Sequence, residues 1–578
     1  MDWNRKLKCY ARLISGFTLI GLHYRMKLNS KLNHSDDKNR HFPTFHLKTW
    51  RSIHCESLSE PISTESKTRI NKSDQKALKS HYQYVICGAG TAAQSAVNTL
   101  SQLHSSENKD SDANTTTTSL LMIAPEWRNP YYNSPLIKNN TESNETEHNN
   151  DEVFAKNPTW DLVLGKSLKA VYADRNEIEL ESGELIQYDK LLIAVGAVVG
   201  IESIHSIHKL DETISHRVLG GHSHEEHALL LNEIEKKCLN NQKLHVTVVG
   251  GGWNGTLYAS HLQALGCDVT LICYEPLPWS RYLPRFICEV LSKLLKAQGI
   301  ELLPYSNVNY ITQMKQNNPH DSQEHADLQV YFTWSYDSFA LNSLRTDYLL
   351  FLPTNSPSCS GNLDGQFYLQ SDPEVGGLLV NSELSAASDV YVAGDCASFP
   401  AVWAGERQRI QSNEHAEQSG LVAALNMYGS RKAYSSEPVR KVYYSALDVA
   451  ILSIGKVSSL SETFCFFAKD GKTSDYTRGV IFYSDMKSNN VIGAVVLFDP
   501  MIDSPNVDSL RKLFDQPIDK RSFKDISQLE ETLAPLARKV YTELHHANSE
   551  ESDSLVFTYR RFFPREKGTK SNSRDDIV

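Results

Sequence analysis

The sequence predicts an α/β protein with two similar strand–turn–helix units, one inserted into the other, and a further α/β domain at the C-terminus. A glycine-rich turn follows an apolar strand and opens a helix at two places, starting at Gly88 and at Gly250. A third apolar strand ends in Gly394-Asp395. Alternating strand and helix runs of this kind are typical of parallel sheets, and 578 residues are too many for a single core.

Composition and pattern set apart five expected parts of the chain. They are a leader over 1–55, a linker over 56–80, a first unit over 81–215 and 350–435, an inserted unit over 216–349 and a disordered tail over 566–578. The short apolar strand 191–196 precedes the inserted unit, and we expect it to lead the chain into that unit.

The leader differs from the body of the chain. Residues 1–55 hold eleven Lys or Arg residues against three Asp residues. Acid-poor leaders that contain Arg and Ser are typical of organellar transit peptides, and a plain disordered tail is the alternative. The apolar run 13–24 is too short for a standard bilayer span, so a short membrane anchor stays open as a third alternative.

The formal net charge of −10 argues against a dedicated nucleic-acid binder, which would carry a basic surplus. The ten cysteines are scattered and form no CxxC pair. This pattern predicts reduced thiols and no metal site. It also lacks the paired redox cysteines that a flavin disulfide reductase needs.

The first glycine motif predicts a dinucleotide site. The sequence GAGTAA at 88–93 follows the strand 84–87 and opens a helix. Gly88 permits the tight turn, Gly90 lets the backbone approach a pyrophosphate, and the helix N-terminus offers free amide groups to it. Glu126 follows the next strand, where an acid binds the ribose hydroxyls. The expected cofactor-binding residues are Gly88, Ala89, Gly90, Thr91, Ala92 and Glu126.

The second glycine motif repeats this plan in the inserted unit. The sequence GGGWNG at 250–255 follows the strand 246–249, and Glu275 follows the next strand. A carboxylate there accepts hydrogen bonds from ribose hydroxyls and repels a 2′-phosphate, which favours NADH over NADPH. The expected cofactor-binding residues are Gly250, Gly252, Gly255 and Glu275.

The third motif, VYVAGDCA at 390–397, ends a strand in an acid. Gly394 lets a ligand come close, and in flavoproteins with two dinucleotide sites the Asp binds a ribityl hydroxyl of FAD. Taken alone, Asp395 could equally cap a helix. The three motifs in this order predict two Rossmann-like domains, with FAD in the first, NADH in the second and hydride passing between them.

These motifs resemble the pyridine nucleotide–disulfide oxidoreductase superfamily and, within it, the apoptosis-inducing factors, a family of mitochondrial flavoproteins. The specific segments are GAGTAA at 88–93, PYYNSPLIK at 130–138, VAGDCA at 392–397, His415-Ala416 with Ser419-Gly420, and RGVIFYS at 478–484. The resemblance implies an FAD domain over 81–215 and 350–435, an NADH domain over 216–349 and a C-terminal dimerisation domain over 436–565.

The resemblance also implies an activity and a location. It implies NADH oxidation with oxygen or a quinone-like acceptor, and a homodimer that forms on reduction. It implies a mitochondrial location, in the intermembrane space or at the inner membrane, with an import or assembly oxidoreductase as partner. The implied roles are respiratory-chain maintenance and caspase-independent apoptosis after release to the nucleus, where the family binds DNA without sequence preference.

The family pattern assigns roles to further residues. Lys138 matches the catalytic lysine near the flavin ring, Leu168 a backbone contact to the adenine end, and Tyr444 a tryptophan beside the flavin. Ser412 and Asn413 lie in a run at 411–413 that replaces Glu-His-His at the nucleotide site.

Other positions depart from the family pattern. Leu257 stands where the family has the glutamate that pairs with the flavin lysine, Asn133 replaces an arginine, and Thr354 replaces a glycine on the nicotinamide side. These departures favour an alternative in which the chain is an FAD-stabilised interaction or pro-apoptotic protein with a degenerate NADH site.

Three further features have simpler explanations. His222, His224 and His227 cluster with two glutamates, yet they follow Gly220-Gly221 at a helix start, so we expect exposed surface histidines and no metal. We expect Trp253 to serve in packing. Basic pairs at 511–512 and 520–521 are interspersed with acids, so a solvated helix face is favoured over a DNA-binding surface.

Overall fold

The computed structural model describes the two dinucleotide-type units and part of the C-terminal domain. The described residues are 78–107, 119–125, 160–199, 212–221, 224–240, 242–313, 328–334, 337–352, 355–357, 369–435, 439–444, 447, 449–468, 476–485, 490–498 and 557–562. No helix among these residues is long and apolar enough to cross a membrane. The expected leader, most of the expected linker and the expected tail lie outside them.

The first unit is built on an eight-stranded sheet of order β18-β19-β6-β1-β2-β3, in which β5 also pairs with β6 and β4 pairs with β5. All pairs from β19 to β3 are parallel, as the alternating strand and helix runs predict. Its strands are β1 (His81–Cys87), β2 (Leu120–Ala124), β3 (Trp160–Leu164), β4 (Leu168–Tyr172), β5 (Glu177–Leu180), β6 (Leu185–Ile193), β18 (Ser385–Ala387) and β19 (Val390–Val392).

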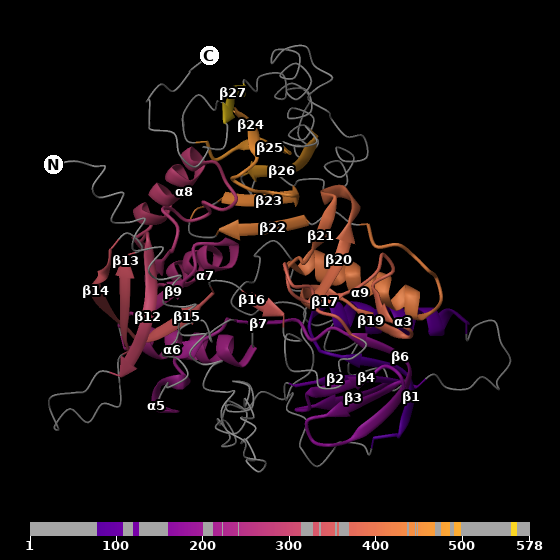
Figure 1. Cartoon of the computed structure of the whole chain (residues 1–578). Helices are drawn as coiled ribbons and strands as arrows, with labels where there is room; N and C mark the ends of the chain where they lie inside the picture. Colours follow the sequence, from indigo (N-terminus) through magenta and orange to yellow (C-terminus); the bar gives the residue numbers. More distant parts are fainter. Residues whose placement is uncertain are drawn as a thin grey trace, which may run out of the picture. The chain divides into compact units, whose positions relative to one another are not determined.

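The core strands of this sheet are almost wholly apolar. The strand β2 reads LLMIA and is buried at every position, as expected for a parallel strand covered on both faces. Helices α3 (Thr91–Glu107) and α9 (Asn413–Met427) pack side by side over the sheet (Figure 1). They approach so closely that a Cβ on Gly420 would lie 2.2 Å from the carbonyl oxygen of Ala92.

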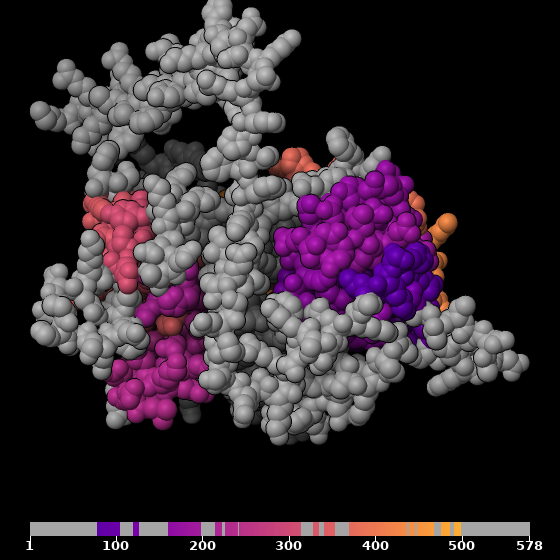
Figure 2. Space-filling view, turned by 90° about the horizontal axis from the view of Figure 1, so that it is seen from below, coloured from indigo at the N-terminus to yellow at the C-terminus, as the bar shows by residue number. Residues whose placement is uncertain are grey.

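A small sheet and a strand pair complete this region. The antiparallel pair β7 (Ala197–Val199) and β16 (Asn355–Pro357) joins the segments that lead into and out of the inserted unit. The small sheet holds β17 (Leu378–Leu379), β20 (Ala397–Ala401) and β21 (Glu406–Gln408), with short 3₁₀ turns at Gly394–Cys396 and Val402–Ala404. Figure 2 shows residues 160–199, in purple, forming one surface with indigo residues from the N-terminal part of the described chain.

The inserted unit is built on a five-stranded parallel sheet of order β11-β10-β9-β15-β8. The strand β15, the last of the five along the chain, crosses the expected boundary at 349/350, because it pairs with β9 as far as Phe351. The strands are β8 (Val218–Leu219), β9 (His245–Val249), β10 (Asp268–Ile272), β11 (Glu301–Leu303) and β15 (Tyr348–Phe351); the helices are α5 (Glu212–Ser215), α6 (His224–Leu239), α7 (Trp253–Ala264) and α8 (Arg285–Ala297). A three-stranded antiparallel sheet adds β12 (Ser306–Gln313), β13 (Leu328–Trp334) and β14 (Asp337–Thr346).

The described part of the C-terminal domain is a six-stranded antiparallel sheet of order β22-β23-β26-β25-β24-β27 (Figure 1). Its strands are β22 (Val439–Tyr444), β23 (Val449–Gly455), β24 (Glu462–Ala468), β25 (Gly479–Ser484), β26 (Val491–Phe498) and β27 (Phe557–Phe562). One face of this sheet shares an apolar cluster with α7 and α8 of the inserted unit. The amphipathic helix α8 supplies Ile287, Leu291 and Leu295 at intervals of four residues, so all three side chains lie on the face that is buried.

Candidate functional site

The first glycine loop is packed on one side and open on the other. Gly88 has φ +126°, and a Cβ there would lie 2.1 Å from the carbonyl oxygen of Ala194, just after the neighbouring strand β6. A Cβ on Gly90 would meet no atom of the described residues within 4 Å. Thus Gly88 is required by the fold, whereas Gly90 leaves free space beside the N-terminus of α3. That space and the free amide groups fit a pyrophosphate.

A second helix N-terminus meets this loop. A Cβ on Gly394, which has φ +72°, would lie 3.1 Å from Cβ of Ala92, and the amide of Gly394 donates to Oγ of Ser419 in α9 at 2.9 Å. Ser412 caps α9, its Oγ accepting from the amide of His415 at 3.1 Å. The positive ends of two helix dipoles therefore lie near one another beside the ends of β1 and β19, which suits an anionic cofactor.

Asp395 lies half-buried at this junction. Burial raises the pKa of its carboxyl to about 6, and the positive charges of Arg409 and Arg440 counter part of that effect. A carboxyl held in such surroundings gains from a hydrogen-bond donor, and the ribityl hydroxyls of FAD are donors of the right kind. The structure thus fits the expected FAD contact at Asp395.

The raised pKa of Asp395 predicts a pH-dependent stability. Ionisation is disfavoured in the folded chain relative to the unfolded chain, whose carboxyl has its ordinary pKa of 3.8. Stability present below that value is therefore lost as the pH rises toward 6. With FAD removed, Asp395→Asn should melt at a higher temperature than the wild type at pH 7, and the difference should vanish near pH 4. Calorimetry across this range checks it; a pH-independent difference would contradict the assignment.

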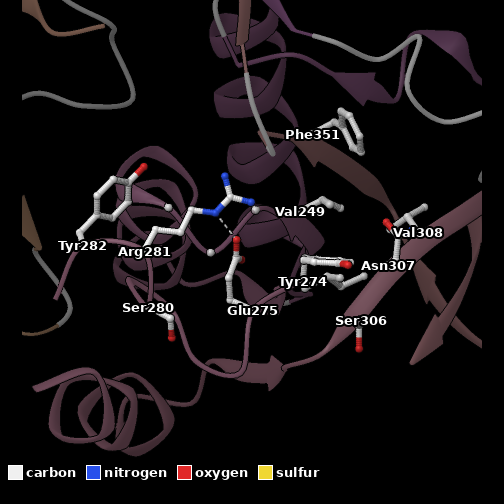
Figure 3. Close-up of a pocket in the computed structure, with 14 residues that line it drawn as sticks. Val249, Tyr274, Glu275, Ser280, Arg281, Tyr282, Ser306, Asn307, Val308 and Phe351 are labelled. Atoms are coloured by element: carbon white, nitrogen blue, oxygen red, sulfur yellow. Dashed lines mark hydrogen bonds and ion pairs between the residues drawn. The ribbon is translucent and has the colours of Figure 1, made fainter. Parts of the chain in front are cut away.

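The second glycine loop borders a cavity of about 130 Å³ at the carboxyl edge of the inserted sheet (Figure 3). The lining residues are Val249, Gly250, Gly251, Gly252, Ile272, Tyr274, Glu275, Ser280, Arg281, Tyr282, Ser306, Asn307, Val308 and Phe351. Carboxyl edges of parallel sheets are where α/β folds bind dinucleotides. The cavity thus brings together the predicted residues Gly250, Gly252 and Glu275.

Packing constraints shape this loop. A Cβ on Gly255 would lie 1.8 Å from the carbonyl oxygen of Gly250, so Gly255, the last glycine of the motif, allows close packing. Trp253 stacks on Tyr282 with ring centroids 4.9 Å apart, which confirms its predicted packing role. The side chain of Glu275 forms an ion pair with Nε of Arg281, a partner that the sequence motif does not predict.

Arg440 joins the two nucleotide sites. From β22, its guanidinium donates to Oδ1 of Asn254 at 3.3 Å, two residues beyond Gly252, and to the carbonyl oxygen of Gln411, just before α9. Its charge also acts on Asp395. One side chain of the C-terminal sheet thus reaches the second glycine loop and the helix that follows the FAD motif. A contact of this kind ties the loop of the second site to the segment that begins α9, beside the first site.

Tyr444 has a different environment from the one expected beside a flavin. Its side chain has 0% exposure, its ring packs edge-on against Trp279 at 5.4 Å, and its hydroxyl accepts from Nε1 of Trp279 at 2.9 Å. Oγ1 of Thr256 lies 3.3 Å away. Burial raises its pKa to about 12. Tyr444 therefore contacts the inserted unit and leaves no ring face exposed for stacking.

Other predicted residues are distributed around the first site. Leu168 begins β4, and the nearby amide of Lys166 donates to the carbonyl oxygen of Ala124 at 3.1 Å, so Leu168 lies near the end of β2 where an adenine contact is expected. Asn413 is exposed in the first turn of α9. Leu257 is buried in an apolar cluster. The predictions for Glu126, Lys138, Asn133 and Thr354, and those for the basic pairs at 511–512 and 520–521, lie outside the described residues.

The expectation of exposed histidines is wrong for His227. This side chain is 2% exposed, and its Nε2 lies 2.9 Å from the hydroxyl of Tyr258, which also donates to the carbonyl oxygen of Gly221 at 2.8 Å. The neighbouring Glu226 is also buried and accepts from the amide of Gly220 at 2.9 Å. These partners satisfy the polar groups and allow their burial. Within the described ranges, no cluster of His, Cys, Asp and Glu could hold a metal ion.

Comparisons with known proteins agree with this geometry. Residues 82–420 match the family model for pyridine nucleotide-disulphide oxidoreductases. The chain is 26% identical over 501 residues to apoptosis-inducing factor 1, mitochondrial, of Dictyostelium discoideum, covering 83% of this chain and 86% of that protein. It is 26% identical over 429 residues to putative apoptosis-inducing factor 1, mitochondrial, of Drosophila melanogaster, covering 68% of this chain but only 52% of that protein. A crystal structure of the covalent putidaredoxin reductase–putidaredoxin complex matches 79% of this chain and 99% of that chain with a TM-score of 0.59 at 16% identity, which shows a shared fold.

Proposed function

The chain belongs to the pyridine nucleotide-disulphide oxidoreductase family, and from this premise we propose that it passes electrons from NADH through FAD to an external quinone-like acceptor or oxygen. FAD and NAD(H) are its cofactors, and it is an FAD-dependent NADH oxidoreductase. When bound, FAD accepts a hydride from NADH and can release the electrons singly or in pairs. The observation that carries the proposal is the pair of glycine loops at the carboxyl ends of β1 and β9, with Arg440 linking the second loop to the segment that begins α9.

The cysteines support an external acceptor over a protein disulfide. The seven cysteines in the described part of the chain are thiols, and six of them are buried. Burial raises the pKa of Cys87, Cys267 and Cys288 to about 12 in each case, and it raises the pKa of Cys273 as well. A thiol held neutral in this way is a poor nucleophile for disulfide exchange. The described residues therefore offer no redox dithiol to receive electrons from the flavin.

An anaerobic stopped-flow experiment tests the proposal. Mixing the FAD-loaded protein with NADH should bleach the flavin absorbance, and adding a soluble naphthoquinone should restore it. An aromatic disulfide such as dithiobis-nitrobenzoate should not restore it. Flavin that stays oxidised in millimolar NADH would overturn the proposal and favour the alternative, an FAD-stabilised interaction protein with a degenerate NADH site. Rapid reoxidation by the disulfide would instead point to a dithiol mechanism.

A mitochondrial location is the second part of the proposal. It is supported by the basic, acid-poor composition of residues 1–55 and by the names of the relatives in Dictyostelium and Drosophila. Other predictions rest on the family resemblance alone. They are roles in respiratory-chain maintenance and apoptosis, dimerisation on reduction, DNA binding in the nucleus, an import partner and inner-membrane association. Imaging the full chain with a C-terminal fluorescent tag, beside a variant lacking residues 1–55, tests the location; equal mitochondrial signal from both would contradict the role of the leader.

A further inference from the structure

The NADH pocket holds a positive group beside the carboxylate that is expected to select NADH. Nε of Arg281 donates to Oε1 of Glu275, and both residues line the cavity. The sequence favours NADH because a carboxylate repels a 2′-phosphate. An arginine paired with that carboxylate neutralises its charge, so the repulsion that would exclude NADPH is much reduced.

The ion pair is held in place by the backbone on both sides. The carbonyl oxygen of Glu275 accepts from the amide of Tyr305 at 3.1 Å. The carbonyl oxygen of Arg281 accepts from the amide of Ser459 at 2.9 Å, in the segment that follows β23. The loop that carries both residues is thus bonded to two separate segments, which fixes the backbone positions from which the two side chains face one another.

The guanidinium keeps donors for a ligand. An arginine has five N–H donors, and Glu275 takes the one on Nε. Figure 3 shows the two terminal nitrogens directed away from Glu275, among the residues that line the cavity. The side chain of Arg281 is 55% exposed, against 18% for Glu275, so the positive group is the more accessible of the two. The planar guanidinium matches the geometry of a phosphate group.

We propose that this pocket accepts NADPH as well as NADH, with Arg281 binding the 2′-phosphate and Glu275 binding the ribose hydroxyls of NADH. The inference rests on the proposed function, because it names the nucleotides used at the same site. With NADH, the ion pair stays intact and Oε2 of Glu275 accepts the hydroxyls. With NADPH, the terminal nitrogens of Arg281 bind the phosphate while its charge offsets the repulsion from Glu275.

Dissociation constants for both nucleotides test the proposal. They are measured by anaerobic titration of flavin reduction in the FAD-loaded full chain, for the wild type, Arg281→Gln and the control Arg285→Gln. The control removes an exposed arginine that pairs with Glu289 outside the cavity. We expect the dissociation constants of the wild type for NADPH and NADH to agree within about tenfold. Arg281→Gln should raise the dissociation constant for NADPH at least about tenfold and that for NADH less than about threefold. Arg285→Gln should change neither.

A second measurement separates this inference from the proposed function. Calorimetric binding of adenosine 2′,5′-bisphosphate and of ADP needs no hydride transfer. If neither NADH nor NADPH bleaches the flavin, yet the bisphosphate binds in an Arg281-dependent way, the activity fails and the inference stands. If NADH bleaches the flavin while NADPH binds more than about 100-fold more weakly than NADH, the inference is overturned. Equal losses for both nucleotides in Arg281→Gln would overturn it too, because Arg281 would then hold the pocket without selecting the phosphate.

Discussion

Replacing Gly90 by valine should give a folded protein that no longer carries FAD. A Cβ at Gly90 meets no atom of the described residues within 4 Å, so we expect this part of the fold to accept a small side chain. It occupies the space through which the backbone approaches the pyrophosphate, so the cofactor is displaced from the amide groups of α3. We expect FAD occupancy after purification to fall at least about tenfold, which corresponds to about 1.4 kcal/mol or more of binding free energy. Absorbance of the released flavin measures the occupancy.

Two matched variants separate cofactor loss from misfolding. Gly88→Ala places a methyl group 2.1 Å from the carbonyl oxygen of Ala194, so it should lower the melting temperature of the FAD-free protein. Gly90→Val should leave that temperature unchanged. Gly252→Val, on the second loop, should keep FAD and weaken the binding of NADH. The fold has room for a Cβ there, because the nearest atom among the described residues is the hydroxyl of Tyr282 at 3.8 Å. Purified Gly90→Val that retains full FAD would show that the pyrophosphate lies elsewhere.

The sequence predicts these loops well because every step of the argument is local. A strand, a glycine turn and a helix follow one another within about twenty residues in a dinucleotide unit, so one pattern specifies both the backbone and its purpose. The structure confirms the two Rossmann-like units and the strands that end just before Gly88, Gly250 and Gly394. Where an interaction stays within such a unit, the order of residues along the chain is sufficient to predict it.

Interactions between distant segments could not be predicted from local sequence patterns. Arg440 lies 186 residues from Asn254, and no periodic pattern links them. The position of His227 just after Gly220-Gly221, at a helix start, predicts exposure, yet Tyr258, from another helix, supplies a partner that permits burial. The Arg281–Glu275 pair spans six residues, but it depends on the turn between them, whose Trp279 has a left-handed φ of +61°. That conformation is rare for a tryptophan and cannot be expected from composition.

Replacing Tyr444 by alanine should destabilise the protein more than any other single change at the junction between the inserted unit and the C-terminal sheet. The change removes a fully buried ring and leaves Nε1 of Trp279 without its acceptor. Emptying such a site costs about 3–5 kcal/mol of unfolding free energy. Tyr444→Phe keeps the ring and loses only the hydroxyl, so the cost should be about 1–3 kcal/mol. Urea unfolding followed by tryptophan fluorescence measures both.

The same variants should also weaken NADH binding. Trp279 donates its amide to the carbonyl oxygen of Gly251 at 2.8 Å, so the residue that Tyr444 holds in place also supports the second glycine loop. Tyr444→Phe should raise the dissociation constant for NADH several-fold and leave FAD occupancy unchanged, because the first loop has no contact with this network among the described residues. The neighbouring Tyr443→Phe, on the opposite face of β22, is the matched control. If Tyr444→Phe matched the control in both stability and NADH affinity, the hydroxyl would have no role in supporting the loop. The C-terminal sheet would then contribute to NADH binding only through Arg440.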